Sequence, residues 1–401
     1  MPVPSMYLSV LPVFLAVFIL IAGNGIITTL VPLRATLEGF ALSEVGAIGS
    51  AYFTGMLAGT WMTPGIVRRA GHIRAFAAYA AVASVATLGL AMLVEPLFWV
   101  TMRGILGFCF AGLFAIFESW ISTKASNNNR GRMLAAYNVV HFSGSALGQQ
   151  VLRLADPRSF TLFSAAAAFL MLGLVPMAMT KADPPPLPPK GRLEILSMYR
   201  ATPIGAIGIV MVGWVNATFW SLAPAYVERQ GLGPGTVASF MTAVIVGSAL
   251  GPYPLGRLSD MLDRRIVIAS TAAAASVVAF AVALAGTGSL PVLYLFAFLL
   301  GLTTPVIYPI ITAHTIDRMG VDKAVAISST LLFLYCCGGI LGPTVAAALI
   351  DRFGDAALFV HNGVVHALLA IFVTWRIMRR PAAVRIATPD DAPGKPPAPG
   401  A

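Results

Sequence analysis

The stretch GSALGPYPLGRLSDMLDRR, from Gly247 to Arg265, interrupts a chain that is otherwise strongly apolar. One apolar run, 237–249, leads into it, and another, 266–285, follows it. A weaker copy, GMLAGTWMTPGIVRRAGHIR, begins 192 residues earlier at Gly55. A polar turn between apolar runs that occurs twice in register indicates a duplicated chain of apolar segments joined by short polar connections.

The composition places those segments in a membrane. The chain has 401 residues, of which 58% are hydrophobic and 10% are charged, whereas soluble domains carry about 25% charged residues. A helix that crosses a bilayer needs about 20 mostly apolar residues. We therefore predict an all-α polytopic membrane protein with twelve transmembrane helices, at approximately 9–33, 44–64, 74–94, 97–121, 133–152, 159–179, 203–224, 236–255, 266–286, 290–312, 324–349 and 356–376.

The net charge of +10 follows the predicted topology. Twenty of the 26 Lys and Arg residues fall in the tail and in the connections on one side of the predicted membrane, five fall on the other side, and one lies within a span. Cytoplasmic loops collect Lys and Arg, so both termini are expected in the cytoplasm. The bilayer accounts for the basic charge, and we expect no nucleic-acid partner.

The duplication divides the chain into two parallel halves. At an offset of 192, Asn24 corresponds to Asn216 and Gly55 to Gly247; at an offset of 194, Gly144 corresponds to Gly338. Six spans in each half give both halves the same orientation, which is the arrangement of two-domain transporters with a central site. We expect six-helix bundles at 1–180 and 201–380, a Pro-rich cytoplasmic linker at 181–200 and a disordered cytoplasmic tail at 381–401.

The polar turn itself resembles motif A of the major facilitator superfamily, approximately G-x-L-S/A-D-R-x-G-R-R/K. The second half matches at Gly256, Asp260, Arg264 and Arg265, and the physical role of Gly256 would be backbone freedom in a short turn. In the first half Pro64 and Arg68 replace the motif's Gly and Asp, while Arg69 and Gly71 keep its character. The resemblance implies a cytoplasmic gate that depends mainly on Asp260.

The segments ESWI (118–121), NRGRMLAAY (129–137) and GSALGQ (144–149) are similar to the bacterial YcaD-type branch of that superfamily. The resemblance implies a monomeric secondary transporter that moves a small solute by alternating access. In the family's antiporters a Gly-Pro motif C lies in the fifth span. That place reads Gly148-Gln149 here, so antiport is not supported and symport stays open.

Two formal charges lie well inside predicted spans, Arg103 and Glu118, and such charges mark functional sites. Fifteen residues separate them, or about 22 Å along a helix, so both can face one cavity without pairing. Arg103, with Gly104 and Gly107, is similar to the family's motif B, which is implicated in proton-linked transport. Arg103 could instead extend to the outer interface, and Glu118 could be a helix-end acid paired with the bases at 124, 130 or 132.

Proton coupling needs a group that gains and loses a proton, which a guanidinium does not do. The candidates are Glu118 first and His141 second. Other in-span polar groups are candidates for the solute cavity, although each is also compatible with ordinary packing: Asn24, Thr28, Asn138, His141, Trp214, Asn216, Trp220, Tyr308 and Tyr335. With Arg103, they suit a sugar, a drug-like amphiphile or a small monoacid.

Other protein classes have little support. The chain carries no H-E-x-x-H, Walker A or G-x-S-x-G motif, and His361 and His366 have no acid companion in register. The cysteines Cys109, Cys336 and Cys337 lie in predicted spans, where thiols usually pack as small apolar groups. We therefore expect no enzyme activity, cofactor or metal. A transporter-like membrane receptor or sensor without flux is the alternative to a transporter.

Overall fold

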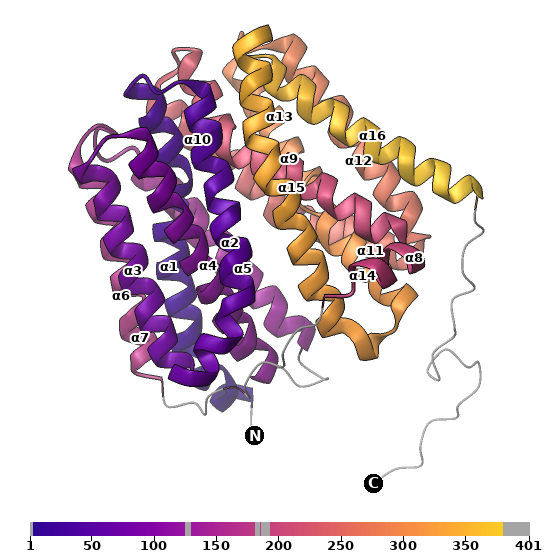
Figure 1. Ribbon diagram of the computed structural model, residues 1–401, viewed down its shortest axis with the longest axis horizontal. Helices are drawn as coiled ribbons and strands as arrows, with labels where there is room; N and C mark the ends of the chain where they lie inside the picture. The colour runs from indigo at the N-terminus through magenta and orange to yellow at the C-terminus, as the bar shows by residue number, and fades with distance from the viewer. Residues whose placement is uncertain (1–2, 125–129, 181–184, 186–192, 380–401) are drawn as a thin grey trace.

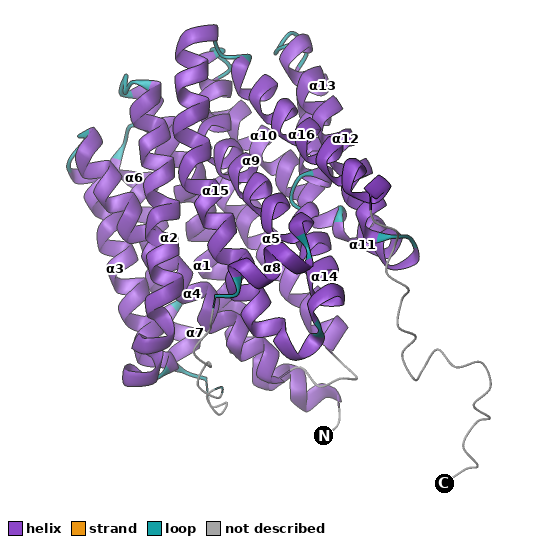
Figure 2. Cartoon of the chain, turned by 45° about the vertical axis from the view of Figure 1, so that its right-hand side comes forward, coloured by secondary structure: helices purple, strands orange, loops and turns teal. Residues whose placement is uncertain are grey.

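The computed structural model describes residues 3–124, 130–180, 185 and 193–379, and these residues form helices without a strand (Figure 2). The first half contains α1 (Val3–Leu37), α2 (Leu42–Ala70), α3 (His72–Met92), α4 (Pro96–Lys124), α5 (Arg130–Val151), α6 (Phe160–Leu172) and α7 (Leu174–Ala178). The second half contains α8 (Ile195–Ala201), α9 (Pro203–Arg229), α10 (Gly233–Leu250), α11 (Pro252–Met261), α12 (Arg264–Ala285), α13 (Leu290–Thr303), α14 (Ile307–Met319), the 3₁₀ helix η1 (Val321–Lys323), α15 (Ala324–Phe353) and α16 (Ala357–Arg379). The predicted linker and tail lie largely outside the described residues.

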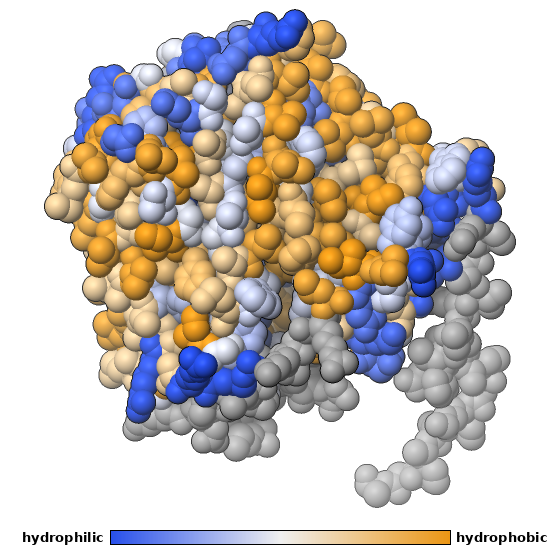
Figure 3. Space-filling model, in the orientation of Figure 1, coloured by the Kyte–Doolittle hydropathy of each residue, from blue (hydrophilic) through white to orange (hydrophobic). Residues whose placement is uncertain are grey.

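The outer surface suits a bilayer. Large apolar side chains such as Trp61, Val85 and Leu284 are exposed, and an apolar surface of this extent is unfavourable in water. Apolar residues cover the middle of the face seen in Figure 3, with hydrophilic residues gathered towards its ends. Since a helix satisfies its own backbone hydrogen bonds, it can cross the hydrocarbon layer. The all-α membrane architecture predicted from composition is confirmed.

Within the described residues, ten segments are long and apolar enough to cross a membrane. The remaining long helices, α2 and α5, do not reach that apolar level. Both pack against the opposite half, α2 on α15 and α5 on α10 (Figure 1). A helix covered by protein can carry more polar residues than one surrounded by lipid, which explains their composition. Twelve crossings stay a prediction.

The two halves repeat the same packing scheme. In the first half α1 packs on α5 and α2 on α4; in the second half the corresponding pairs are α9 on α15 and α10 on α13. The peripheral pairs α3·α6 and α12·α16 correspond in the same way. Repetition of the pairs in chain order identifies a structural repeat, as the duplicated sequence predicts.

Glycine allows the closest of these crossings. A Cβ atom on Gly107 of α4 would overlap the carbonyl oxygen of Tyr52 on α2, and one on Gly301 of α13 would overlap that of Val244 on α10. These positions correspond between the halves: Gly107 and Gly301 differ by 194, and Tyr52 and Val244 by 192. The spacing of glycine along the duplicated chain therefore encodes backbone-to-backbone contact.

One predicted role for glycine is wrong. Gly256 lies inside α11 with open space around it, and it has no positive φ. The turn between α11 and α12 is made by Leu262 and Asp263 instead. In the first half Gly71 does provide the backbone freedom, since its φ of 80° favours glycine.

The close crossing of α4 and α2 at Gly107 can be tested by mutation. Gly107→Ala should lower the midpoint of thermal unfolding in detergent, because its methyl group must separate α4 from α2, and overpacking costs about 1–3 kcal/mol. Gly65→Ala is the matched control, because Gly65 also lies within a helix but faces open space. Its midpoint should be unchanged or slightly higher, since Ala favours helix. Equal midpoints for Gly107→Ala and wild type would contradict the close crossing.

Candidate functional site

Arg103 of α4 is buried, with 7% of its surface exposed. Its guanidinium carbon lies 4.6 Å from the centre of the Tyr52 ring on α2, in a cation–π contact. Its Nε atom is buried without a hydrogen-bond partner, and Arg103 forms no ion pair with any residue that the structure describes. The side chain therefore does not extend to a lipid interface; it is a cation inside the protein.

Aromatic residues connect this cation to the other half of the molecule. Tyr52 packs edge-on against Phe53, with ring centres 5.5 Å apart, and Phe53 lies 6.2 Å from Tyr335 of α15. Tyr335 in turn packs against Tyr308 of α14, with ring centres 5.4 Å apart. The aromatic row crosses the boundary between the halves, where a change in their relative position alters its contacts.

Glu118 lies further along α4, on the same helix as Arg103. Its side chain is exposed, and the hydroxyls of Tyr137 on α5 and Tyr308 on α14 lie within electrostatic range of its carboxyl group. It forms no ion pair with Arg132 or with another described residue. The side chains of the other proposed partners, at 124 and 130, lie outside the description. Tyrosines from both halves of the molecule thus lie in the neighbourhood of Glu118.

His141 of α5 belongs to the same region. Its ring lies 5.9 Å from that of Tyr137 and 6.4 Å from that of Phe114, measured between centres. Its Nδ1 atom is buried without a hydrogen-bond partner. Asn138, one turn earlier on α5, is exposed. A row of residues runs along the boundary of the halves, with Arg103 at one end and Glu118 and His141 about 22 Å away at the other. We refer to Arg103, Glu118, His141, Tyr308 and Tyr335 as the central cluster.

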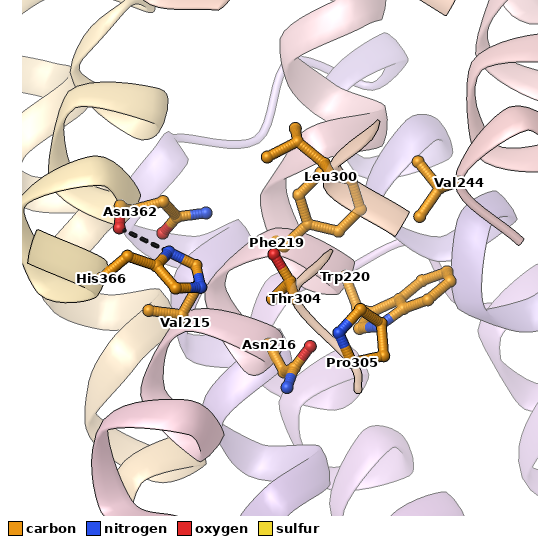
Figure 4. A pocket seen from close by; sticks show the side chains of 10 residues that line it. All are labelled: Val215, Asn216, Phe219, Trp220, Val244, Leu300, Thr304, Pro305, Asn362 and His366. Atoms are coloured by element: carbon orange, nitrogen blue, oxygen red, sulfur yellow. Dashed lines mark hydrogen bonds between the residues drawn. The ribbon is translucent and has the colours of Figure 1, made fainter. Parts of the chain in front are cut away.

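Other residues predicted for the solute cavity lie on α1 and α9. On α1, the Thr28 hydroxyl donates to the Asn24 carbonyl oxygen at 2.8 Å. On α9, Asn216 and Trp220 line a small cavity inside the second bundle, together with Thr304, His366 and others (Figure 4). Its volume of about 20 Å³ is room for about one water molecule. Asn216 and Trp220 therefore line a cavity within the second bundle.

Trp214 also faces the interior of the second bundle. Its Nε1–H donates to His361 Nε2 at 2.8 Å, and the other ring nitrogen of His361 lies 3.1 Å from the side-chain oxygen of Asn362. The His366 Nδ1 atom is 2.9 Å from the Asn362 carbonyl oxygen. Each of these two α16 histidines is therefore hydrogen-bonded within the protein, His361 to Trp214 and Asn362 and His366 to Asn362. Sequence reasoning missed these pairings, as it missed Tyr52, Phe53 and Tyr137 of the central region.

The polar turn forms an ion-pair network at one end of the second bundle. Arg264 pairs with Asp260 at 2.9 Å and with Asp317 of α14 at 2.7 Å. Arg265, only 4% exposed, pairs with Asp263 at 2.7 Å. Hydrogen bonds from Arg265 hold the pKa of Asp263 below its usual value. In the first half Arg69 is exposed at the end of α2.

Hydrogen bonds between the halves gather towards the opposite end. Ser50 bonds Thr344 at 2.8 Å, and Gln150 donates to Thr242 at 2.7 Å. Arg153, just beyond α5, donates to the Gly235 carbonyl oxygen at 3.1 Å. The ribbons of the halves diverge towards the end that carries α11 and α14 (Figure 1). In this state the halves are joined at the end remote from the polar turn.

The model of the Major Facilitator Superfamily matches residues 3–149 and 205–400. The chain belongs to that superfamily. It is therefore a multi-pass membrane transporter, and its relatives are transporters rather than enzymes. The YcaD-type resemblance is also confirmed: the uncharacterized MFS-type transporter YcaD of Escherichia fergusonii is 28% identical over 338 residues, covering 84% of this chain and 87% of the relative. YcaD of Salmonella typhi is 28% identical over 343 residues, with the same coverage.

Solved transporters share the fold. The nucleoside transporter NupG superposes with a TM-score of 0.74 at 13% identity, over 92% of this chain and 98% of that one. A bacterial homolog of the human lysosomal transporter Spinster, in an inward-facing and occupied conformation, gives a TM-score of 0.73 at 14% identity, over 95% and 100%. At these identities the likeness shows the superfamily fold and leaves the solute to be argued from the site itself.

The ion-pair network of the transporter predicts a gating effect. In this state, open at the end that carries α11, Asp260 pairs with Arg264 of its own bundle, so a latch requires a contact with the first half that forms when this end closes. Asp260→Asn should remove that contact and raise the population of states open at that end. Accessibility labelling of single cysteines near α11 and α14 measures this population. Asp322→Asn, a change to an exposed acid outside the network, is the control. Identical labelling of the Asp260 and Asp322 variants would show that Asp260 is not a latch.

Proposed function

We propose that this protein is a proton-coupled secondary transporter of a small monoacid, which it moves as an anion by alternating access. The observation that carries the proposal is the buried, unpaired Arg103 guanidinium. The aromatic row beside it offers contact surface for the apolar part of such a solute. Sugars and drug-like amphiphiles are the competing solutes.

The charge of Arg103 favours an anion over a neutral solute. A guanidinium stays protonated in proteins, and an unpaired charge in the membrane interior is unfavourable. The Tyr52 ring compensates only part of that cost, because a cation–π contact contributes about 0.5–2 kcal/mol. A carboxylate solute could form a bidentate pair with the guanidinium. The missing partner of Arg103 would then be supplied by the solute.

Glu118 is the proposed proton carrier, with His141 as the second candidate. Tyrosine hydroxyls from both halves lie within electrostatic range of its carboxyl group, so its surroundings change when the halves move relative to each other. A group whose surroundings alternate in this way can take up a proton in one state and release it in the other.

The direction of opening follows from the proposed topology. With the Lys- and Arg-rich end in the cytoplasm, the hydrogen bonds of Ser50 and Arg153 close the outer end. The structure would then be an inward-facing state in the bacterial inner membrane, with both termini cytoplasmic and a single chain as the transport unit.

The role of Arg103 is testable by ligand-induced stabilisation. Monoacids, sugars and amphiphiles are screened for a rise in the thermal unfolding midpoint of the purified transporter. We expect monoacids to bind wild type, Arg103→Gln to weaken binding at least about tenfold, as for loss of a charge-assisted pair, and Arg103→Lys to retain part of it. Arg352→Gln, a change to an exposed arginine, should bind normally. A neutral ligand with unchanged affinity for Arg103→Gln would contradict the anion proposal.

Proton coupling is tested by flux into proteoliposomes. Glu118→Gln should abolish uphill accumulation driven by a proton gradient, because it cannot exchange a proton, while leaving solute exchange largely intact. His141→Gln is the comparison. Loss of accumulation in His141→Gln alone would move the carrier role to His141, and full accumulation by both variants would contradict coupling through this cluster. Specific binding without any flux would favour the receptor or sensor alternative.

A further inference from the structure

A second cavity lies in the second bundle near the polar turn, apart from the central cluster. It measures about 30 Å³, about twice the space that one water molecule needs. Five elements meet there: the end of α8, the start of α9, the start of α12, and the ends of α14 and α16. The residues that define it are Thr202, Ile204, Arg265, His314, Arg318 and Arg376.

The lining of this cavity is basic. Arg265, Arg318 and Arg376 reach it from three helices, and none of its described lining residues is acidic. Two acids, Asp263 and Asp317, lie nearby, within electrostatic range of His314. Asp263 also pairs with Arg265. The cavity also lies at the N-terminus of α9, a helix of 27 residues, and the positive end of a helix dipole favours anions. Its electrostatic potential therefore suits a negatively charged group.

His314 adds a polar group to the cavity. Only 6% of its surface is exposed, it lines the cavity, and it forms no hydrogen bond with any residue in the described part of the chain. Buried polar groups in native proteins almost always have a partner. An imidazole that lines a basic cavity, with no hydrogen bond to a described residue, can donate to an oxyanion together with the arginines.

We propose that this cavity binds a phosphate group. Arginine forks match the geometry of phosphate oxygens, and three of them converge here from different helices. The surroundings favour a phospholipid headgroup over free phosphate, because apolar side chains beside the cavity are exposed, including Leu196 and Tyr199 on α8 and Met378 on α16. Basic pockets between helices at the cytoplasmic surface are suited to anionic lipid headgroups.

The experiment uses the full-length transporter in detergent after delipidation. The probes are dioleoyl phosphatidylglycerol, dioleoylglycerol, which has the same chains without the phosphate, and inorganic phosphate. Native mass spectrometry measures binding, and thermal unfolding measures stabilisation. We expect phosphatidylglycerol to bind and stabilise wild type, and dioleoylglycerol to do neither. An equal response to both lipids would overturn the proposal. Stabilisation by millimolar inorganic phosphate, with no added effect of the lipid, would assign the site to free phosphate.

Matched variants locate the binding. Arg376→Gln and His314→Gln should each bind phosphatidylglycerol about tenfold more weakly, as expected for loss of one contact to a charged group. Arg379→Gln, one turn further along α16 and outside the cavity lining, should bind normally. Arg376→Lys keeps the charge and should restore part of the affinity, which separates binding from misfolding. Undiminished binding by both Arg376→Gln and His314→Gln would overturn the proposal.

Discussion

The close contact between α2 and α4 determines the environment of the buried cation. Gly104 and Gly107 follow Arg103 on α4, and any side chain at Gly107 would overlap the backbone of α2 at Tyr52. Only that close approach places the Tyr52 ring over the Arg103 guanidinium. In a membrane, small residues are what allow such contact, because lipid provides little hydrophobic force between helices. Glycine packing and electrostatics thus depend on the same few residues.

Arg103 contrasts with other arginines of the molecule. Arg34 pairs with Glu38 at 2.6 Å, Arg229 with Asp355 at 2.7 Å, and Arg264 with two acids. Those pairs lie near helix ends, where partial exposure to water limits both their cost and their strength. Arg103 has an aromatic ring in place of an acid, and it lies deeper. A cation retained under those conditions is better explained by what it binds than by what it stabilises.

The duplicated halves have diverged most at their charged and polar positions. At the offset of 194, the counterpart of Arg103 is Ala297, that of Glu118 is Thr312, and that of His141 is Tyr335. The glycine crossings, by contrast, occur in both halves. The fold is therefore symmetric while the proposed chemistry is not. In the central cluster the first half supplies an arginine, a glutamate and a histidine, and the second half supplies two tyrosines.

The sequence by itself determined the helical membrane fold, the parallel duplication and the two charges inside α4, because hydropathy, glycine spacing and charge are properties of local segments. It did not determine which side of a helix faces which neighbour, since helices that are apolar on nearly every side have no polar face to reveal their rotation. Only the tertiary structure therefore placed Tyr52 over Arg103, joined Trp214 to His361, and showed Gly256 inside a helix. These features depend on contacts between distant segments, which no local pattern encodes.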